Sequence, residues 1–289
     1  MCEHDDLDEF AHRSGDVTRR QFGAMALGAG IAAVLPKLAK AAETHGRAVD
    51  IKTPDGVADA YFVHPAKGPN PGVLIWPDIL GLRPAFEQMA TRLAESGYSV
   101  LVINPFYRIR KAPTAPVKPD FNDPATRQAL MSLAGTLTPD TNVTDARAFV
   151  SFLDEQRAVD KKRRLATTGY CMGGPFVLRT AAAFPDRIGA GATFHGGGLV
   201  TDKPDSPHLL IPKMKAHFLI AIAASDDKTD PQAKEVLRDS FAKAHLPAEI
   251  EVYAGAQHGW CPPDSPVYDP VPAQKAWSRM MALLAGSLA

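Results

Sequence analysis

Short apolar runs alternate with amphipathic stretches along most of the chain from Val49 onward. The apolar runs predict buried strands, and the stretches with apolar residues at helical spacing predict helices. An opening hairpin is predicted because Thr53-Pro-Asp-Gly56 carries proline and glycine at turn positions between two strand-like segments. The predicted strands are 49–52, 60–63, 72–76, 99–103, 164–168, 189–194, 217–224 and 249–253. The predicted helices are 83–96, 140–156, 175–183, 231–245 and 272–288.

This alternation of strands and helices is typical of an α/β fold with a mostly parallel central sheet and helices on both faces. Neither an internal repeat nor a second core is visible, so residues 42–289 are predicted to form a single domain. Three proline-rich segments interrupt the alternation of predicted strands and helices, at 111–124, 203–212 and 262–272. Each follows the carboxyl end of a strand or the motif after it, where the ligand crevice of an open sheet lies. We therefore expect them to form walls of a site.

The first 41 residues have a different character. A polar segment, 1–17, leads to Thr18-Arg19-Arg20-Gln21-Phe22, and an apolar run rich in alanine and glycine follows at 22–35. Ala39-Lys40-Ala41 fits a small-x-small cleavage site. The segment resembles a twin-arginine export signal, which predicts recognition by the export machinery and a periplasmic or exported protein. One alternative is a cytoplasmic protein in which this segment is a disordered tail plus a short helix packed on the body. The other is an uncut signal that anchors the chain to a membrane.

The composition narrows the range of partners. With 45% hydrophobic and 22% charged residues and a formal net charge of zero, the chain gives no reason to expect nucleic acid, which requires a clustered positive field. No stretch reaches the roughly 18 apolar residues of a membrane-spanning helix, so no stable insertion is expected after signal cleavage. No metal motif or dinucleotide fingerprint is present, so no cofactor is expected. We predict a small-molecule substrate and a monomer or small homo-oligomer.

The most informative short stretch is Gly169-Tyr-Cys171-Met-Gly173, between a predicted strand and a predicted helix. It matches the nucleophile elbow of α/β-hydrolases, with cysteine where serine is more common. The turn exposes the sulfur at the top of the sheet, and the N–H of Met172 points toward the same place from a helix N-terminus. The alternative is that Cys171 is a small buried residue in a helix turn.

The order of the later residues favours the nucleophile. In this fold the acid and then the base follow the nucleophile along the chain. Asp226 and Asp227 follow one predicted strand, and His258 lies in a glycine-flanked loop after the next. We favour Asp226 as the acid because it is nearer the strand end. His195 is a rival base, since it follows strand 189–194, but we expect it to be a substrate-pocket residue.

The chain from about Val49 to Leu288 resembles the dienelactone hydrolase family. The resemblance implies that Cys171 is the nucleophile, that Asp226 orients His258, and that His258 is the base. It further implies an oxyanion hole formed by the N–H groups of Ile79 and Met172, and an Arg108 that faces a substrate carboxylate. The matching segments are Trp76-Pro-Asp-Ile-Leu-Gly-Leu82, Asn104-Pro-Phe-Tyr-Arg108, Gly169-Tyr-Cys-Met-Gly-Gly174, Ala224-Ser-Asp226 and Ala256-Gln-His258-Gly259.

Two positions depart from the family pattern. Asp78 stands where the founding members carry glutamate, and Trp260 begins the segment where they carry a second substrate-binding arginine, so Trp260 is predicted to contact substrate. Arg83 is a candidate replacement for that arginine. We expect Asp78 to accept a hydrogen bond from the resting thiol of Cys171, until substrate draws Arg108 away from Asp78. The alternative is that Asp78 merely caps the turn that follows it.

These observations predict a hydrolase that cleaves a lactone or carboxylic ester through a cysteine thioester, similar to carboxymethylenebutenolidase. The competing interpretation is a non-catalytic or redox thiol protein in which Cys171 pairs with Cys261, three residues past His258. A ligand-binding homologue without turnover is a third interpretation, which the ordered acid and base disfavour.

Overall fold

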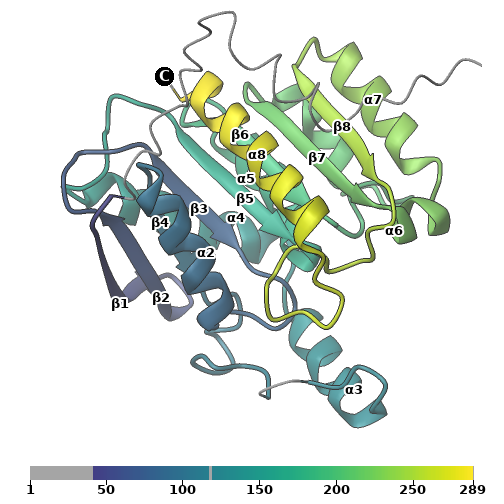
Figure 1. Cartoon of the computed structure of the whole chain (residues 1–289), viewed down its shortest axis with the longest axis horizontal. Coiled ribbons are helices and arrows are strands. Elements are labelled where there is room, and N and C mark those ends of the chain that lie inside the picture. Colours follow the sequence, from purple (N-terminus) through teal and green to yellow (C-terminus); the bar gives the residue numbers. More distant parts are fainter. Residues whose placement is uncertain (1–41, 117–118, 289) are drawn as a thin grey trace, which may run out of the picture. The chain divides into compact units, whose positions relative to one another are not determined.

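The structure is a computed structural model that describes residues 42–116 and 119–288 (Figure 1). The predicted signal segment, 1–41, lies outside the described residues. The strands are Thr44–Thr53 (β1), Gly56–Pro65 (β2), Gly72–Trp76 (β3), Ser99–Ile103 (β4), Leu165–Tyr170 (β5), Ile188–Phe194 (β6), His217–Ala223 (β7) and Ala248–Tyr253 (β8). The α-helices are Pro84–Glu95 (α2), Pro124–Ala134 (α3), Pro139–Glu155 (α4), Gly174–Ala183 (α5), Ala224–Thr229 (α6), Ala233–Lys243 (α7) and Pro270–Ser287 (α8). Two 3₁₀ helices span Cys171–Gly173 (η1) and Pro207–Lys213 (η2).

The described strands form one sheet in the order β1-β2-β4-β3-β5-β6-β7-β8. β1 and β2 form the predicted antiparallel hairpin, and β2 pairs antiparallel with β4. All the remaining pairs are parallel, which confirms the expected mostly parallel sheet. The chain leaves β3 for β4 on one side and later returns to β5 on the other. The carboxyl ends of β3 and β5 therefore meet at a topological switch point, where open α/β sheets bind their ligands.

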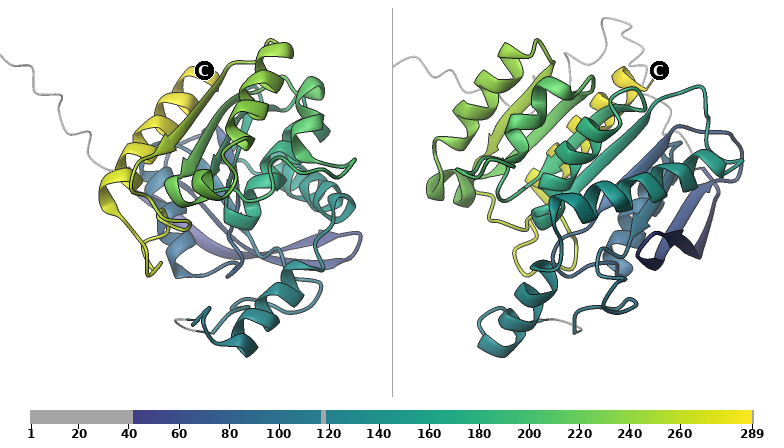
Figure 2. Two further views of the ribbon diagram at one scale, coloured as in Figure 1. Left: turned by 90° about the vertical axis from the view of Figure 1, so that its right-hand side faces the viewer. Right: turned by 180° about the vertical axis from the view of Figure 1, so that it is seen from behind.

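Helices cover both faces of the sheet, as the fully apolar strands require. One core lies under α4, α5 and α7, and includes Phe149, Val177 and Phe241. The other lies under α2 and α8, and includes Phe86 and Met280. Figure 1 shows α2 and α8 in front of the sheet, and the reverse view in Figure 2 shows α4, α5 and α7. Alternate residues of β3 enter opposite cores, which explains why the strand is apolar throughout.

Two helices, α3 and α6, were not predicted from the sequence. α3 follows the proline-rich segment 111–124, and it projects away from the helices that cover the sheet (Figure 1). Its start carries a cap, since the Asp123 side chain accepts a hydrogen bond from the Thr126 N–H at 2.9 Å and Pro124 follows directly. The short helix α6 places Asp226 in a helical turn rather than in an open loop. None of the described helices is long and apolar enough to cross a membrane.

Candidate active site

Cys171 lies on the turn between β5 and α5, in the first position of η1. Its φ of 51° is in the left-handed region, which a residue with a side chain adopts only when the surrounding structure holds it there. The flanking glycines explain how the turn is held. A Cβ on Gly169 would lie 2.2 Å from the carbonyl oxygen of Gly173, and a Cβ on Gly173 would lie 2.3 Å from that of Trp76. Only glycine fits at either position.

A chain of hydrogen bonds joins Cys171 to His258 and His258 to Asp226. The distance from His258 Nε2 to Cys171 Sγ is 3.0 Å, and that from His258 Nδ1 to Asp226 Oδ2 is 2.9 Å. The backbone N–H of His258 also donates a hydrogen bond to Ser225 Oγ at 2.8 Å, which fixes the loop that carries the imidazole. The three side chains come from the carboxyl ends of β5, β7 and β8, so the parallel sheet brings together residues that are distant in sequence.

The charge of His258 follows from these contacts. Burial of the ring lowers the pKa of His258, but hydrogen bonds to Asp226 and Cys171 outweigh that effect and raise the pKa to about 10. The imidazole is therefore protonated at neutral pH. An imidazolium in hydrogen-bond contact with a sulfur stabilises negative charge on that sulfur. The charged imidazole therefore lies in direct hydrogen-bond contact with the sulfur of Cys171.

The two N–H groups predicted to form the oxyanion hole belong to Ile79, in the turn after β3, and to Met172, directly after Cys171. Gly173 packs on the carbonyl oxygens of Trp76 and Pro77, so the elbow and the turn after β3 are in contact. In that turn, the Asp78 carbonyl accepts from the Gly81 N–H and its carboxylate accepts from the Leu80 N–H, both at 2.9 Å. The N–H of Ile79 takes no part in these two bonds. Met172 directly follows Cys171 at the beginning of the helical run, where N–H groups favour an anion.

The pattern that defines the dienelactone hydrolase family matches residues 58–288. The chain belongs to the dienelactone hydrolase family. The carboxymethylenebutenolidase of Rhodococcus opacus is 26% identical over 235 residues, which cover 79% of this chain and 86% of that protein. The family of the chain and the names of its homologues identify it as a hydrolase of lactones or carboxylic esters.

Solved structures of the family share the fold. A dienelactone hydrolase-like promiscuous phosphotriesterase from metagenomic libraries superposes with a TM-score of 0.70 at 22% identity, covering 85% of this chain and 99% of that one. The dienelactone hydrolase of Anabaena variabilis superposes with a TM-score of 0.61 at 14% identity, over the same fractions. At these identities the likeness bears on the fold, which is the α/β-hydrolase fold expected from the elbow.

In this member of the dienelactone hydrolase family we expected Asp78 to accept a hydrogen bond from the thiol of Cys171. The carboxylate of Asp78 has other partners instead. Its carboxylate oxygens accept from Arg83 Nη1 at 2.7 Å and Nη2 at 2.9 Å, in addition to the Leu80 N–H. Arg83 also donates to Asp264, from Nε at 2.7 Å and from Nη2 at 3.0 Å. The bidentate pair occupies Asp78, because a planar guanidinium matches two carboxylate oxygens better than a thiol does. Arg83 thus bridges the turn after β3 and the segment after His258.

Arg108 also differs from its expected role. It pairs with Asp145 at 2.7 Å and 2.9 Å and with Asp55 at 2.5 Å and 3.0 Å, instead of with Asp78. Asp145 is only 2% exposed, and it additionally accepts from the Tyr107 hydroxyl at 2.7 Å. Two carboxylates already satisfy this guanidinium. Arg108 therefore stabilises the junction between the loop after β4 and α4 in this structure, and its guanidinium is occupied by Asp55 and Asp145.

His195 and Trp260 lie in the interior behind His258. His195 is 1% exposed, and its ring centroid lies 5.1 Å from those of both His258 and Trp260, in edge-to-face contacts. Burial, with the nearby charge of His258 as a second cause, lowers the pKa of His195 well below its usual value, so the ring is neutral. It is His258 and not His195 that reaches Cys171. In this structure the ring of His195 packs against the imidazole of His258, and Trp260 packs against His195, instead of both lining an open pocket.

The two cysteines of the described part of the chain are both free thiols. Cys171 faces His258, whereas Cys261 is buried on the α2 and α8 side of the sheet, where burial raises the pKa of its thiol. The disulfide of the competing redox interpretation is not formed here. Across residues 42–116 and 119–288, no group of three or more His, Cys, Asp or Glu side chains is arranged to hold a metal ion.

Proposed function

We propose that Cys171 is the nucleophile of this lactone and ester hydrolase. The thiolate attacks the substrate carbonyl carbon, and the carbonyl oxygen becomes an oxyanion that accepts hydrogen bonds from the N–H groups of Ile79 and Met172. Each such donor contributes about 3 to 4 kcal/mol to stabilisation of the transition state. The C–O bond of the ester or lactone then breaks, and the imidazolium of His258 gives its proton to the leaving alkoxide. The product of this half-reaction is a thioester on Cys171.

His258 acts again when the thioester is hydrolysed. Now neutral, it takes a proton from a water molecule as the water attacks the thioester carbonyl. The tetrahedral intermediate collapses, the thiolate of Cys171 leaves, and the carboxylic acid product is released. Asp226 holds the imidazole in the required orientation and stabilises its charged form. The chemistry at each step is supplied by the protein's own side chains and backbone.

The observation that carries this proposal is the unbroken chain of contacts from Cys171 Sγ to His258 Nε2 and from His258 Nδ1 to Asp226. Nucleophile, base and orienting acid are in hydrogen-bond contact, which is the arrangement that activated nucleophiles share. The order of the three residues along the chain is that of α/β-hydrolases. A protein that only binds a ligand has no need for these three groups in contact.

Trapping the intermediate tests the proposal directly. Wild-type protein mixed with p-nitrophenyl acetate and quenched in acid during turnover is expected to carry one acetyl group on the peptide that contains Cys171, as measured by tandem mass spectrometry. Ser225, whose hydroxyl accepts a hydrogen bond from the backbone N–H of His258, is an alternative nucleophile. Acetyl on Ser225, or turnover with an unmodified Cys171 throughout, would contradict the assignment.

We further propose that residues 1–41 are a twin-arginine export signal and that residues 42–289 are the single catalytic domain. The support is the segment Thr18-Arg19-Arg20-Gln21-Phe22, followed by the apolar run and by Ala39-Lys40-Ala41. Because the export receptor reads the arginine pair, the double substitution Arg19→Lys and Arg20→Lys is expected to leave the protein in the cytoplasm. Immunoblots of periplasmic and cytoplasmic fractions measure this. A normal periplasmic fraction of the double variant would rule out this route, and an N-terminal sequence that begins at Met1 would rule out cleavage.

A further inference from the structure

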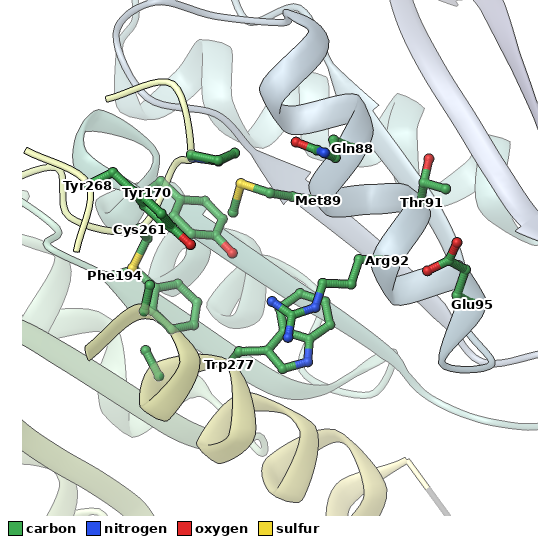
Figure 3. A pocket seen from close by; sticks show the side chains of 13 residues that line it. Gln88, Met89, Thr91, Arg92, Glu95, Tyr170, Phe194, Cys261, Tyr268 and Trp277 are labelled. Carbon is green, nitrogen blue, oxygen red and sulfur yellow. The ribbon is translucent and has the colours of Figure 1, made fainter. Parts of the chain in front are cut away.

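A cavity of about 650 Å³ opens between α2 and α8, on the face of the sheet opposite α4 and α5 (Figure 3). It reaches the chain segments that carry Cys171 and His258 without including either side chain. Its floor is formed by residues at the ends of the central strands, and its rim is formed by the two helices. The lining residues used below are Met89, Arg92, Glu95, Tyr170, Phe194 and Trp277.

The floor of the cavity is aromatic. The rings of Tyr170 and Phe194 are stacked, with centroids 4.9 Å apart and an interplanar angle of 17°. Both side chains are buried in the protein, and Figure 3 shows the Tyr170 hydroxyl directed toward the cavity beside Met89. A ring of a ligand can lie on such a surface with offset stacking or with a sulfur–aromatic contact.

The rim carries a guanidinium that forms no ion pair with any described residue. Arg92 lies over the indole of Trp277, with its guanidinium carbon 3.9 Å from the ring centroid, and it donates to the neutral amide oxygen of Gln274 at 2.6 Å. Among the described residues, no carboxylate lies within ion-pair distance of Arg92. Arg83 and Arg108, by contrast, each pair with two carboxylates. A guanidinium has five N–H donors, so Arg92 retains several that can face a ligand.

We propose that this cavity is a binding site for an aromatic monocarboxylate, separate from the catalytic centre. The ring of the ligand lies against Tyr170 and Phe194, and its carboxylate pairs with Arg92, held in place by Trp277. Glu95 lines the same cavity about one helical turn beyond Arg92. Arg92 is the one cation among the residues that line the cavity, so one carboxylate of a ligand can form an ion pair there. The proposal does not depend on the identity of the nucleophile.

Calorimetric titration of the full-length protein tests this site. The probes are 3-phenylpropanoate and its neutral isostere 3-phenylpropanamide. The acid is expected to bind at least about tenfold more tightly than the amide, because a hydrogen bond to a charged group is worth more than one to a neutral group. Arg92→Gln is expected to weaken binding of the acid by about tenfold and to remove the preference over the amide. Trp277→Ala is expected to weaken binding of both probes.

Two further variants serve as controls. Arg92→Lys keeps the charge but loses the planar fork, so its affinity for the acid is expected to lie between those of the wild type and Arg92→Gln. Arg279→Gln removes an exposed arginine of α8, the helix that carries Trp277. Arg279 pairs with Glu249 outside the cavity, so this variant is expected to bind both probes as the wild type does. Absence of binding at about 10 mM probe, or binding of the acid that both Arg92→Gln and Trp277→Ala leave unchanged, would overturn the proposal. The second result would place the acid elsewhere, for example at Cys171.

Discussion

Replacing Cys171 with alanine is expected to lower kcat for ester and lactone hydrolysis by about six orders of magnitude, as loss of the nucleophile does in a serine hydrolase with the same kind of triad. The alanine side chain cannot form the thioester, and only substrate binding and the backbone N–H groups remain. Substitution of a small apolar residue for cysteine leaves the fold intact, so the unfolding midpoint is expected to stay near that of the wild type. Initial rates with p-nitrophenyl acetate and with a panel of lactones measure the effect.

Cys261→Ala is the matched control, because it removes the other thiol of the described part of the chain. Cys261 is buried away from His258, and its substitution is expected to leave kcat within about threefold of wild type. If Cys171→Ala retained substantial activity, the proposed nucleophile would be wrong. If Cys261→Ala lost as much activity as Cys171→Ala, the redox interpretation that requires both thiols would be favoured instead.

Gly173→Ala is expected to destabilise the protein by about 3 kcal/mol or more and to remove most of its activity. The added Cβ would lie 2.3 Å from the carbonyl oxygen of Trp76 and 2.7 Å from that of Pro77. Both are backbone atoms of the turn after β3, so no side-chain rotation can relieve the clash. The elbow must move away from that turn, which separates Cys171 from the N–H of Ile79. Urea unfolding together with kcat measurements would show both effects.

Gly286→Ala is the control for the general effect of adding a methyl group at a glycine. Gly286 lies in α8, and a Cβ there would meet no atom within 4 Å. Alanine has the higher helix propensity, so this variant is expected to be as stable as wild type or more stable by up to about 1 kcal/mol. A Gly173→Ala protein with wild-type stability and kcat would show that the elbow does not need the close approach between the two segments.

Much of the fold could be predicted because the strands are short, apolar and separated by regular amphipathic helices. The strand 72–76 and the strand 99–103 were predicted with the bounds that the structure has. The missed helix α3 buries only two residues, Leu130 and Leu133, so few apolar positions mark its inner face in the sequence. The capping pair Asp123-Pro124 was the sequence feature that could have identified its start.

The candidate site was predictable only in part, and the reason is the distance in sequence between partners. The positions of Cys171, Asp226 and His258 after strand ends follow from chain order, so their proximity could be anticipated. Which carboxylate pairs with which arginine could not. Arg83 meets Asp264 across 181 positions and Arg108 meets Asp145 across 37, and no local pattern encodes either pairing.

The direction of a side chain, into the interior or toward substrate, was a second property of the site that the sequence did not show. His195 follows a strand end, which is where functional residues lie, but its ring is directed into the interior. Nothing in the sequence distinguishes a ring that supports His258 from behind from one that faces the substrate. The cavity between α2 and α8 likewise depends on how far apart the two helices pack, a quantity that the apolar pattern of each helix does not contain.

The Arg83 bridge gives the protein a dependence on ionic strength. Arg83 and Asp78 are 11% and 12% exposed, whereas Asp264, at the other end of the bridge, is 43% exposed. Dissolved ions screen an exposed pair more strongly than a sheltered one. Added salt therefore weakens the Arg83–Asp264 contact before it weakens Arg83–Asp78. The segment after His258 gains freedom while the turn after β3 stays fixed, so salt concentration sets how tightly these two segments are held together.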